Sequence, residues 1–155
     1  MAIEIFEGHQ DRVVSATFSP DGSMIITAGD DRTARLWNLF GEEIAVLAGH
    51  TDYKTSAVFS PDGKMILTES WDSTARLWTS DGEALAVLGG NTGGLSSAVF
   101  NPDGDLIVIA SGDNIPRLGK LYDMEQMIQL VKEKINLELD LNNCIKYLES
   151  FCYLD

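Results

Sequence analysis

A 41-residue repeat constrains the fold of this 155-residue chain more strongly than any other feature. One turn tetrapeptide recurs as Ser19-Pro-Asp-Gly22, Ser60-Pro-Asp-Gly63 and Asn101-Pro-Asp-Gly104. A second marker keeps the same spacing, as Gly8-His9, Gly49-His50 and Gly90-Asn91. A third does so as Thr33-Ala-Arg-Leu-Trp37, Thr74-Ala-Arg-Leu-Trp78 and Ile115-Pro-Arg-Leu-Gly119. Three markers in one register over two periods indicate a repeat protein in which each repeat forms one supersecondary unit.

Each repeat is expected to contain short β-strands. In the first repeat, strands are predicted at residues 13–19, 24–28, 33–37 and 43–47. Pro20 presets φ for the turn between the first two strands, and Gly22 ends that turn. Four strands every ~40–45 residues, with a Gly-His pair near the start, are typical of one blade of a β-propeller.

These motifs resemble the WD40 family over about residues 1–121, although the last dipeptide of the family motif is altered to Trp37-Asn38 and Trp78-Thr79. The resemblance implies an all-β fold of three WD40 β-propeller blades, an incomplete propeller, followed by a small C-terminal α-helical tail. We expect the repeats within residues 1–122, beginning with a strand at 1–7 that precedes the first blade. The blades are expected at about residues 8–48, 49–89 and 90–121, and the tail at 123–155.

The resemblance also implies a structural hydrogen-bonded set of His, Ser or Thr, Asp and Trp inside each blade. By position, the second repeat has the complete set of His50, Ser70, Asp72 and Trp78. The first repeat has His9, Asp31 and Trp37 but carries Gly29 in the hydroxyl position. The third keeps Ser111 and Asp113 but has Asn91 for the His and Gly119 for the Trp. We therefore expect the third blade to be the least stable.

Positions at the start of the first strand of a blade, and just before the structural Asp, commonly bind partners in the family. On this chain they are occupied by Arg12, Asp30, Tyr53 and Trp71. Trp71 is the most informative of them, because the other repeats have Asp30 and Gly112 there and a blade does not require an aromatic. Large aromatics and Arg dominate interface hot spots, so a protein-binding role is predicted. The alternative is that Trp71 only covers a loop.

Catalytic and metal chemistry find little support in the residues. His9 and His50 could act as general bases or metal ligands, but each is paired by register with an Asp at equivalent repeat positions, which favours a structural role. Cys144 and Cys152 do not extend these histidines to a metal-binding spacing. Arg35, Arg76 and Arg117 share one repeat position, which favours a structural or solvated face. We expect no enzyme, metal or cofactor; a propeller-fold hydrolase remains a remote alternative based on fold analogy.

The charge of the chain narrows its partners. The formal net charge is −13, and the Lys and Arg residues do not cluster as phosphate binding requires. Nucleic acid and membranes are therefore not expected as partners, which leaves proteins or peptides. The first residues have no basic start and no long apolar stretch, so no secretory signal is predicted. Two cysteines close together fit free thiols in a reducing compartment, and we expect a cytoplasmic protein.

Three blades are too few to close a propeller, which has about four to eight. Residues 2–6 match the outer-strand segments 44–47 and 85–88, whereas the third repeat turns helical after Leu121 and lacks an outer strand. The N-terminal strand of one chain could complete the third blade of another, giving a six-bladed homo-oligomer of two chains. The competing hypothesis is a purely structural fragment of a larger WD40 signalling protein.

The C-terminal tail has a helical period. Met124, Met127, Ile128, Val131 and Ile135 are spaced as one apolar helix face, and a second such stripe runs from Leu141 to Cys152. The tail is similar to short helical ends that follow WD40 arrays in bacterial, especially cyanobacterial, proteins. It is expected to cap the blades, with an adaptor or oligomerisation segment as the alternative.

Overall fold

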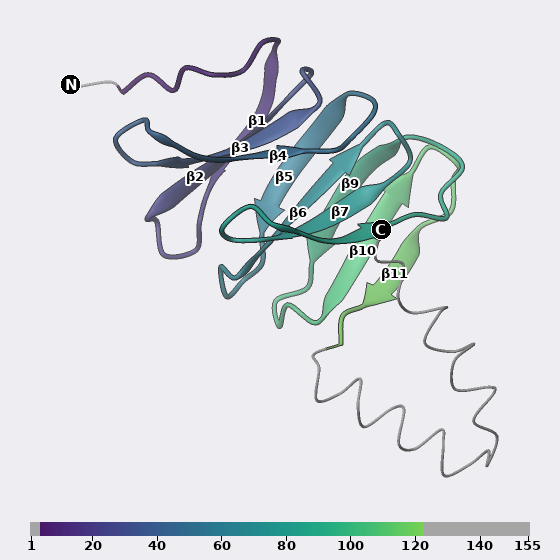
Figure 1. Ribbon diagram of the computed structural model, residues 1–155. Helices are drawn as coiled ribbons and strands as arrows, with labels where there is room; N and C mark the ends of the chain where they lie inside the picture. The colour runs from purple at the N-terminus through teal and green to yellow at the C-terminus, as the bar shows by residue number, and fades with distance from the viewer. Residues whose placement is uncertain (1–3, 123–155) are drawn as a thin grey trace, which may run out of the picture.

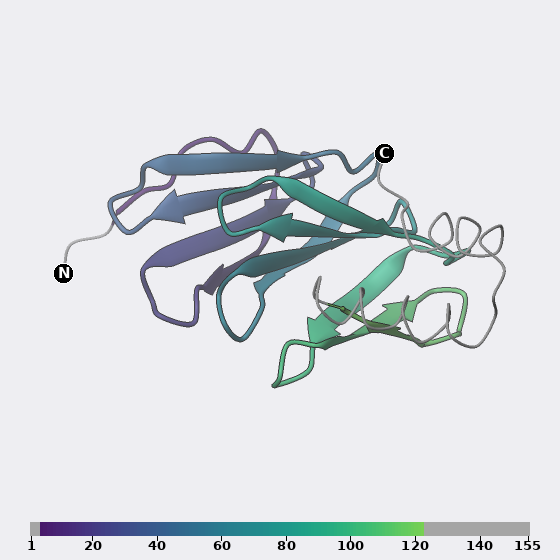
Figure 2. The same ribbon diagram turned by 60° about the horizontal axis from the view of Figure 1, so that its bottom comes forward.

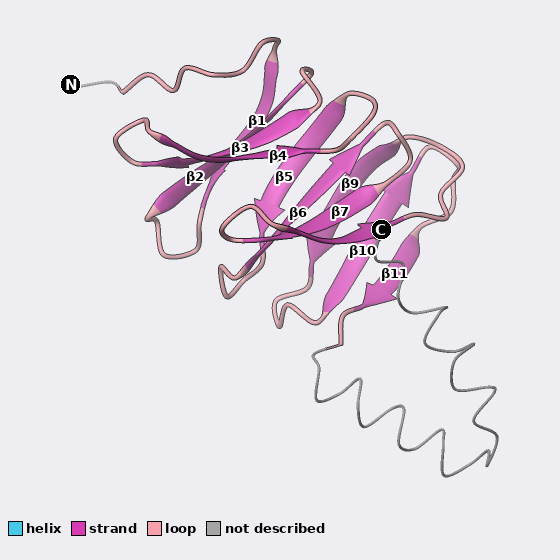
Figure 3. Cartoon of the chain, in the orientation of Figure 1, coloured by secondary structure: helices cyan, strands magenta, loops and turns pink. Residues whose placement is uncertain are grey.

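The computed structural model describes residues 4–122, a region built entirely of strands and connecting loops (Figures 1 and 3). The first sheet contains β1 (Val13–Phe18), β2 (Met24–Gly29), β3 (Thr33–Asn38) and β4 (Glu43–Ala48). The second contains β5 (Lys54–Phe59), β6 (Met65–Ser70), β7 (Ala75–Thr79) and β8 (Ala84–Leu88). The third contains β9 (Leu95–Phe100), β10 (Leu106–Ser111) and β11 (Arg117–Lys120). The predicted tail at 123–155 lies outside the described residues.

Each sheet is an antiparallel meander in which sequential strands pair, so each is one propeller blade. The strand orders are β1-β2-β3-β4, β5-β6-β7-β8 and β11-β10-β9. The blades follow one another side by side (Figure 2), and their first strands β1, β5 and β9 contact one another in series. The predicted all-β arrangement of three blades in an incomplete propeller is therefore confirmed. β11 is short and lies at the edge of its sheet, as expected where Pro116 precedes it and lacks a ladder donor.

The Pro-Asp-Gly segments form the turns between the first two strands of each blade. In the first, Gly22 has φ +72° and its N–H donates to the carbonyl of Ser19. The Ser19 hydroxyl donates to Asp21 Oδ1 at 2.6 Å, and this bond, with those from Ser23, lowers the pKa of Asp21 to about 2. The carboxylate therefore closes its own turn.

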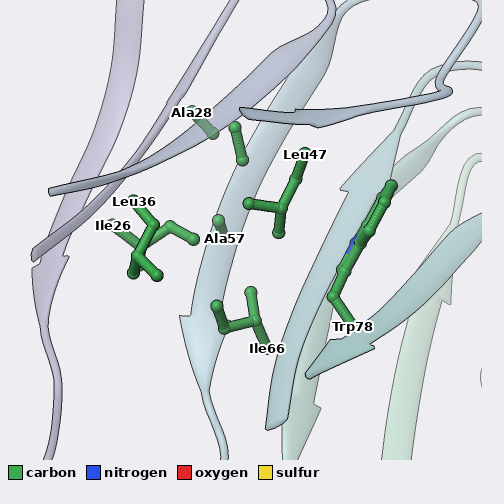
Figure 4. Close-up of a cluster of buried hydrophobic side chains, with 8 residues drawn as sticks. Ile26, Ala28, Leu36, Leu47, Ala57, Ile66 and Trp78 are labelled. Atoms are coloured by element: carbon green, nitrogen blue, oxygen red, sulfur yellow. The ribbon is translucent and has the colours of Figure 1, made fainter. Parts of the chain in front are cut away.

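The blades pack on one another through equivalent repeat positions. Between the first two blades, aliphatic side chains of β2, β3 and β4 meet Ala57, Ile66 and Trp78 (Figure 4). Between the second and third, Leu67 and Leu77 meet β9 and β10 residues that include Leu95 and Ile107. Because the second blade contributes opposite faces to these two clusters, its central strands β6 and β7 are mostly buried.

The N-terminal segment differs from the expectation of a strand at 1–7. Over its described part, residues 4–12, it forms no strand, because a strand needs a hydrogen-bonded neighbour and none of the strands within residues 4–122 pairs with it. The segment nevertheless packs on the first blade. The ring of Phe6 meets the Trp37 indole edge to face, with centroids 5.7 Å apart. The Ile5 carbonyl lies against Gly41, where a Cβ would be 3.0 Å from it.

Candidate protein-binding site

A chain of hydrogen bonds ties the loops of the second blade to its core. His50 Nδ1 lies 2.8 Å from Asp72 Oδ2, and His50 Nε2 lies 3.0 Å from Thr68 Oγ1. The Trp78 indole N–H donates to the same hydroxyl at 2.9 Å. A carboxylate can only accept, so Nδ1–H donates to Asp72, Nε2 accepts from Thr68, and Thr68 accepts from Trp78. The network thus fixes both the imidazole tautomer and the indole.

The first blade contains the same network. His9 Nδ1 lies 2.9 Å from Asp31 Oδ2, His9 Nε2 lies 2.7 Å from Thr27 Oγ1, and the Trp37 indole N–H donates to Thr27 at 2.8 Å. In both blades the two ring nitrogens of the His are occupied by structural partners. The histidines are therefore arranged to brace the blade.

The hydroxyl of this network is not at the predicted position. The repeat register assigned it to Ser70, with Gly29 as a defect in the first repeat, but the bridging hydroxyls belong to Thr68 and Thr27, two residues earlier on the strand. Ser70 ends β6 and instead donates to the loop carbonyls of Asp52 and Tyr53, at 3.0 and 2.8 Å. Two residues along a strand span roughly 6.6 Å, so Ser70 is too near the loop to reach the indole. The first network is consequently complete.

The third blade lacks the His–Thr–Trp part of the network. Asn91, Ile109 and Gly119 occupy the equivalent positions, so the indole and the hydroxyl it binds are both missing. Asp113 still accepts the N–H groups of Thr92 and Ile115, and it pairs with Arg117 at 2.9 Å. Ser111, predicted as the hydroxyl of this set, donates to the Gly93 carbonyl, as Ser70 does in its loop.

The structural carboxylates are held ionised by their donors. Burial raises the pKa of Asp72, but hydrogen bonds from the Thr74 hydroxyl, the Thr51 N–H and His50 outweigh it and bring the pKa to about 2. In Asp31, burial likewise raises the pKa, and bonds from Gln10, Thr33 and His9 lower it to about 2. Within residues 4–122, no group of three or more His, Cys, Asp and Glu side chains is placed to hold a metal ion.

The lowered pKa of Asp72 predicts a pH-dependent contribution to stability. Because its folded pKa lies below the unfolded value of about 3.9, the contribution is fully present above about pH 5 and is lost as the pH falls toward 2. We expect Asp72→Asn to be less stable than wild type at pH 7 and to show a shallower decline of the unfolding free energy between pH 5 and 2. Urea titrations across this range measure both; parallel curves for the two proteins would contradict the assignment.

The four predicted partner residues lie at one end of the first two blades, beside these networks. The backbone brings each pair together in the same way, since the N–H of Asp30 donates to the Arg12 carbonyl and that of Trp71 donates to the Tyr53 carbonyl. The side chains differ. Arg12 Nε donates to Asp30 at 2.9 Å, whereas the Tyr53 and Trp71 rings stand edge to face with centroids 6.4 Å apart. Trp71 remains 58% exposed and Tyr53 51% exposed.

Equivalent positions in the third blade are both glycine. The N–H of Gly112 donates to the Gly94 carbonyl at 2.9 Å, so the backbone contact persists without side chains. Gly94 also lies under Trp71, where a Cβ would be 3.1 Å from the Trp71 Cα. One end of the three blades therefore presents an ion pair, an aromatic pair and a bare glycine pair in succession. The aromatic pair is the apolar part of that surface.

Two of the three strand arginines, Arg35 and Arg117, pair with carboxylates. Arg35 pairs with Glu43 and lies 4.0 Å from Asp31, and Arg117 pairs with Asp113. The glycine of each Gly-His pair makes room for them. A Cβ on Gly8 would lie 2.7 Å from Nη1 of Arg35, and one on Gly49 would lie 2.7 Å from Nη1 of Arg76.

The comparison with known families assigns the class of this fold. A family model described as the WD domain, G-beta repeat, matches residues 2–38, 41–79 and 82–118, which together make up most of the chain. The protein belongs to the WD40 family, whose members are typically non-catalytic and bind other proteins.

Three curated proteins are similar to this chain over about one repeat length each. The chain is 48% identical over 42 residues to an uncharacterized WD repeat-containing protein of Synechocystis sp., a match that covers 27% of this chain and 13% of that protein. It is 51% identical over 35 residues to two Arabidopsis thaliana proteins named Cell division cycle 20.6 and 20.5, cofactor of APC complex, covering 23% of this chain and 8% of each. The matched segments span a small part of each relative. Among residues 4–122, no helix is long and apolar enough to cross a membrane.

Proposed function

We propose that this protein is a non-catalytic interaction scaffold that binds a protein or peptide partner at the end of the blades where Tyr53 and Trp71 lie. The observation that carries the proposal is the exposed aromatic pair itself. Neither equivalent pair contains an aromatic, so the fold does not demand one at these positions. A large aromatic held in place but left exposed is a typical hot-spot residue for a protein partner.

The arrangement around the pair supports binding by a preformed surface. Trp71 is fixed by its own backbone bond to Tyr53, by the edge-to-face ring contact and by Gly94 beneath it. A side chain that is already ordered loses little conformational entropy when a partner covers it. Arg12, whose guanidinium is exposed beside Asp30, offers a polar contact on the neighbouring blade.

The competing functions have less support. For a propeller-fold hydrolase, neither His9 nor His50 is placed as a general base, because both ring nitrogens of each are engaged within the blades. A purely structural role, in which the chain acts only by assembling with other blades, leaves the aromatic pair without a purpose. We further propose that the protein works in the cytoplasm as a homo-oligomer that completes a propeller, without nucleic-acid or membrane partners; the charge of −13 supports the last point.

Replacement of Trp71 tests the binding proposal. Peptides selected on the wild-type protein from a phage-displayed library supply the ligand, and fluorescence anisotropy measures their Kd. We expect Trp71→Ala to raise the Kd by about 30-fold or more, which corresponds to roughly 2 kcal/mol of lost contact, and Tyr53→Ala to raise it by a smaller factor. Phe40→Ala is the matched control, because Phe40 is also an exposed aromatic but lies on a different turn. Unchanged affinity in Trp71→Ala would refute the proposed site.

A further inference from the structure

We propose that a second copy of this chain covers both open blade faces, and that residues 4–6 of each copy add an outer strand to β11 of the other. The inference deepens the oligomer that the proposed function includes, by assigning its contacts and strand register. It depends on a comparison within the molecule, since each position on an open face has repeat equivalents on the internal blade interfaces.

The open face of the third blade carries apolar residues that are buried elsewhere. Val99, Val108 and Leu118 lie in one row across β9, β10 and β11, because Val108 pairs with both of the others. Val108 is 45% exposed and Leu118 is 68% exposed, whereas their equivalents in the second blade, Leu67 and Leu77, are 1% and 4% exposed against the third blade. This face is therefore built to receive the inner face of another blade.

The open face of the first blade carries the complementary set. Val13 is 49% exposed, whereas its equivalent Leu95 is fully buried in the interface between the second and third blades. Ile25 is half-buried, whereas its equivalents in the other two blades are fully buried. Together with Phe6 and Trp37 these side chains line an apolar groove of about 470 Å³. The two open faces thus match the two sides of an internal blade interface.

The turns give an independent indication of the same contact. The Pro20 ring lies on Gly63 of the next blade, 3.5 Å from where a Cβ would be, and the Pro61 ring lies in the same way on Gly104, at 3.4 Å. In this series Gly22 has nothing within 4 Å of its Cβ position, and Pro102 is exposed. Pro102 of one copy on Gly22 of the other would continue the series across the joint.

The N-terminal segment already occupies the place of an outer strand relative to the first blade. Phe6 contacts Trp37 as its repeat equivalent Leu47 shares a core with Trp78. The carbonyl of the preceding residue, Ile5, lies against Gly41. In the same way the side chain of Ala45 on β4 lies against Gly82. The family matches agree with this equivalence. The first match begins at residue 2, just before this segment, and the second begins at residue 41, just before β4. What this segment lacks is the strand beside it, and β11 is an edge strand without an outer neighbour in the described residues.

The internal sheets fix the register of the proposed pairing. Leu36 pairs with Ala45 in the first blade, and Leu77 pairs with Ala86 in the second. One period on, Leu118 of one copy is placed opposite Glu4 of the other, and Arg117 opposite Ile5. Two copies joined twice in this way form a closed ring of six blades with two-fold symmetry, within the usual range of propellers, and remove both open edges.

Disulfide trapping tests the register. In a background with Cys144→Ser and Cys152→Ser, we expect the pair Glu4→Cys and Leu118→Cys on one chain to form a two-chain species under mild oxidation, because directly opposed residues have Cβ atoms about 5 Å apart. Glu4 precedes β1 and Leu118 belongs to β11, and these two strands lie at opposite ends of the row of blades (Figure 1), so the two positions cannot join within one chain. The pair Glu7→Cys and Leu118→Cys is out of register and is expected to stay a single chain. Equal trapping of both pairs, or of neither, would overturn the register.

The molar mass in solution tests whether a second copy of the chain covers the open faces. Light scattering on the wild type should give twice the 17.0 kDa of one chain, and Leu118→Asp should give one folded chain, since it places a carboxylate in the joint. Phe40→Asp should keep the double mass, because Phe40 is exposed and lies outside both open faces. The substitution introduces the Asp that the second repeat has at this position. A wild type of single mass, with the faces covered by residues 123–155 or left open, would overturn the inference, as would a Leu118→Asp protein of unchanged mass.

The two proposals fail separately. Tyr53 and Trp71 lie on the middle blade, away from the joint, so peptide affinity and molar mass are independent measurements. A single-chain wild type whose peptide binding is lost in Trp71→Ala would remove this inference and keep the binding function. A two-chain molar mass, together with peptide affinities that Trp71→Ala leaves unchanged, would keep this inference and remove the binding function.

Discussion

The Trp78→Ala protein is expected to lose about 3–5 kcal/mol of unfolding free energy. The indole is 3% exposed and stands between the first and second blades, where it meets the side chains of Leu47 and its neighbours (Figure 4). Truncation to Ala leaves a cavity that two packed sheets cannot close, and it also removes the donor to Thr68.

Urea denaturation followed by circular dichroism measures this loss. Trp71→Ala is the matched control, because it deletes the same side chain from an exposed site and should cost at most about 1 kcal/mol. If Trp78→Ala does not fold, Trp78→Phe keeps most of the ring volume and should still be destabilised through the lost indole hydrogen bond. Equal stability of Trp78→Ala and Trp71→Ala would show that the blade interface does not depend on this ring.

Thr68→Val is expected to destabilise the protein by about 2–4 kcal/mol, although it preserves the shape of the side chain. Thr68 is fully buried, and its single hydroxyl serves both the Trp78 indole N–H and His50 Nε2. Loss of a partner costs a buried polar group about 1–3 kcal/mol, and here two groups lose the same partner. The substitution therefore separates the hydrogen-bond contribution of the network from its packing.

The control for this substitution is Thr92→Val, because Thr92 is exposed and its hydroxyl lies at a long 3.5 Å from Asp113. It should change the unfolding free energy by no more than about 0.5 kcal/mol. Thr27→Val should reproduce the loss in the first blade, because its network is the same. A neutral Thr68→Val would mean that the His and Trp are held by packing alone, and that the hydroxyl position is not structural.

Most of the fold could be predicted from the sequence because the repeat carries local signals. The Pro-Asp-Gly turns fix where strands begin and end, and apolar residues at equivalent positions reveal which faces are buried. The predicted strands of the first repeat differ from β1 to β4 only at their end residues. The absence of a strand over residues 4–7 was not predictable in this way, because pairing depends on a neighbouring strand and not on the propensity of the segment.

The structural network was predicted in part. Register alone brings His50, Asp72 and Trp78 together, but the choice between Thr68 and Ser70 depends on how deep each hydroxyl lies along β6. A signal was nevertheless present, since Thr27 and Thr68 are one period apart whereas Gly29 and Ser70 differ. A hydroxyl that recurs with its His and Trp is a better candidate than one that does not.

The partner residues were placed at one end of the blades by register, but their mutual contacts were not predicted. The Tyr53–Trp71 ring contact requires the loop backbone to turn both side chains the same way, which no local pattern encodes. The close approach of the Arg35 and Arg76 guanidinium groups to Gly8 and Gly49 was likewise not predicted. Such contacts depend on side-chain geometry between segments that are ~20 residues apart, beyond the range of turn and periodicity signals.

Backbone hydrogen exchange of the N-terminal segment tests the completed propeller most directly. In a single chain, residues 4–7 lie outside any strand, so their amides should exchange within seconds. If a second copy's β11 pairs with them, exchange of this peptide in the wild type should be slowed to the level of the β4 peptide, and Leu118→Asp should abolish that protection. Rapid exchange of residues 4–7 in the wild type, at concentrations where β4 is protected, would contradict the account.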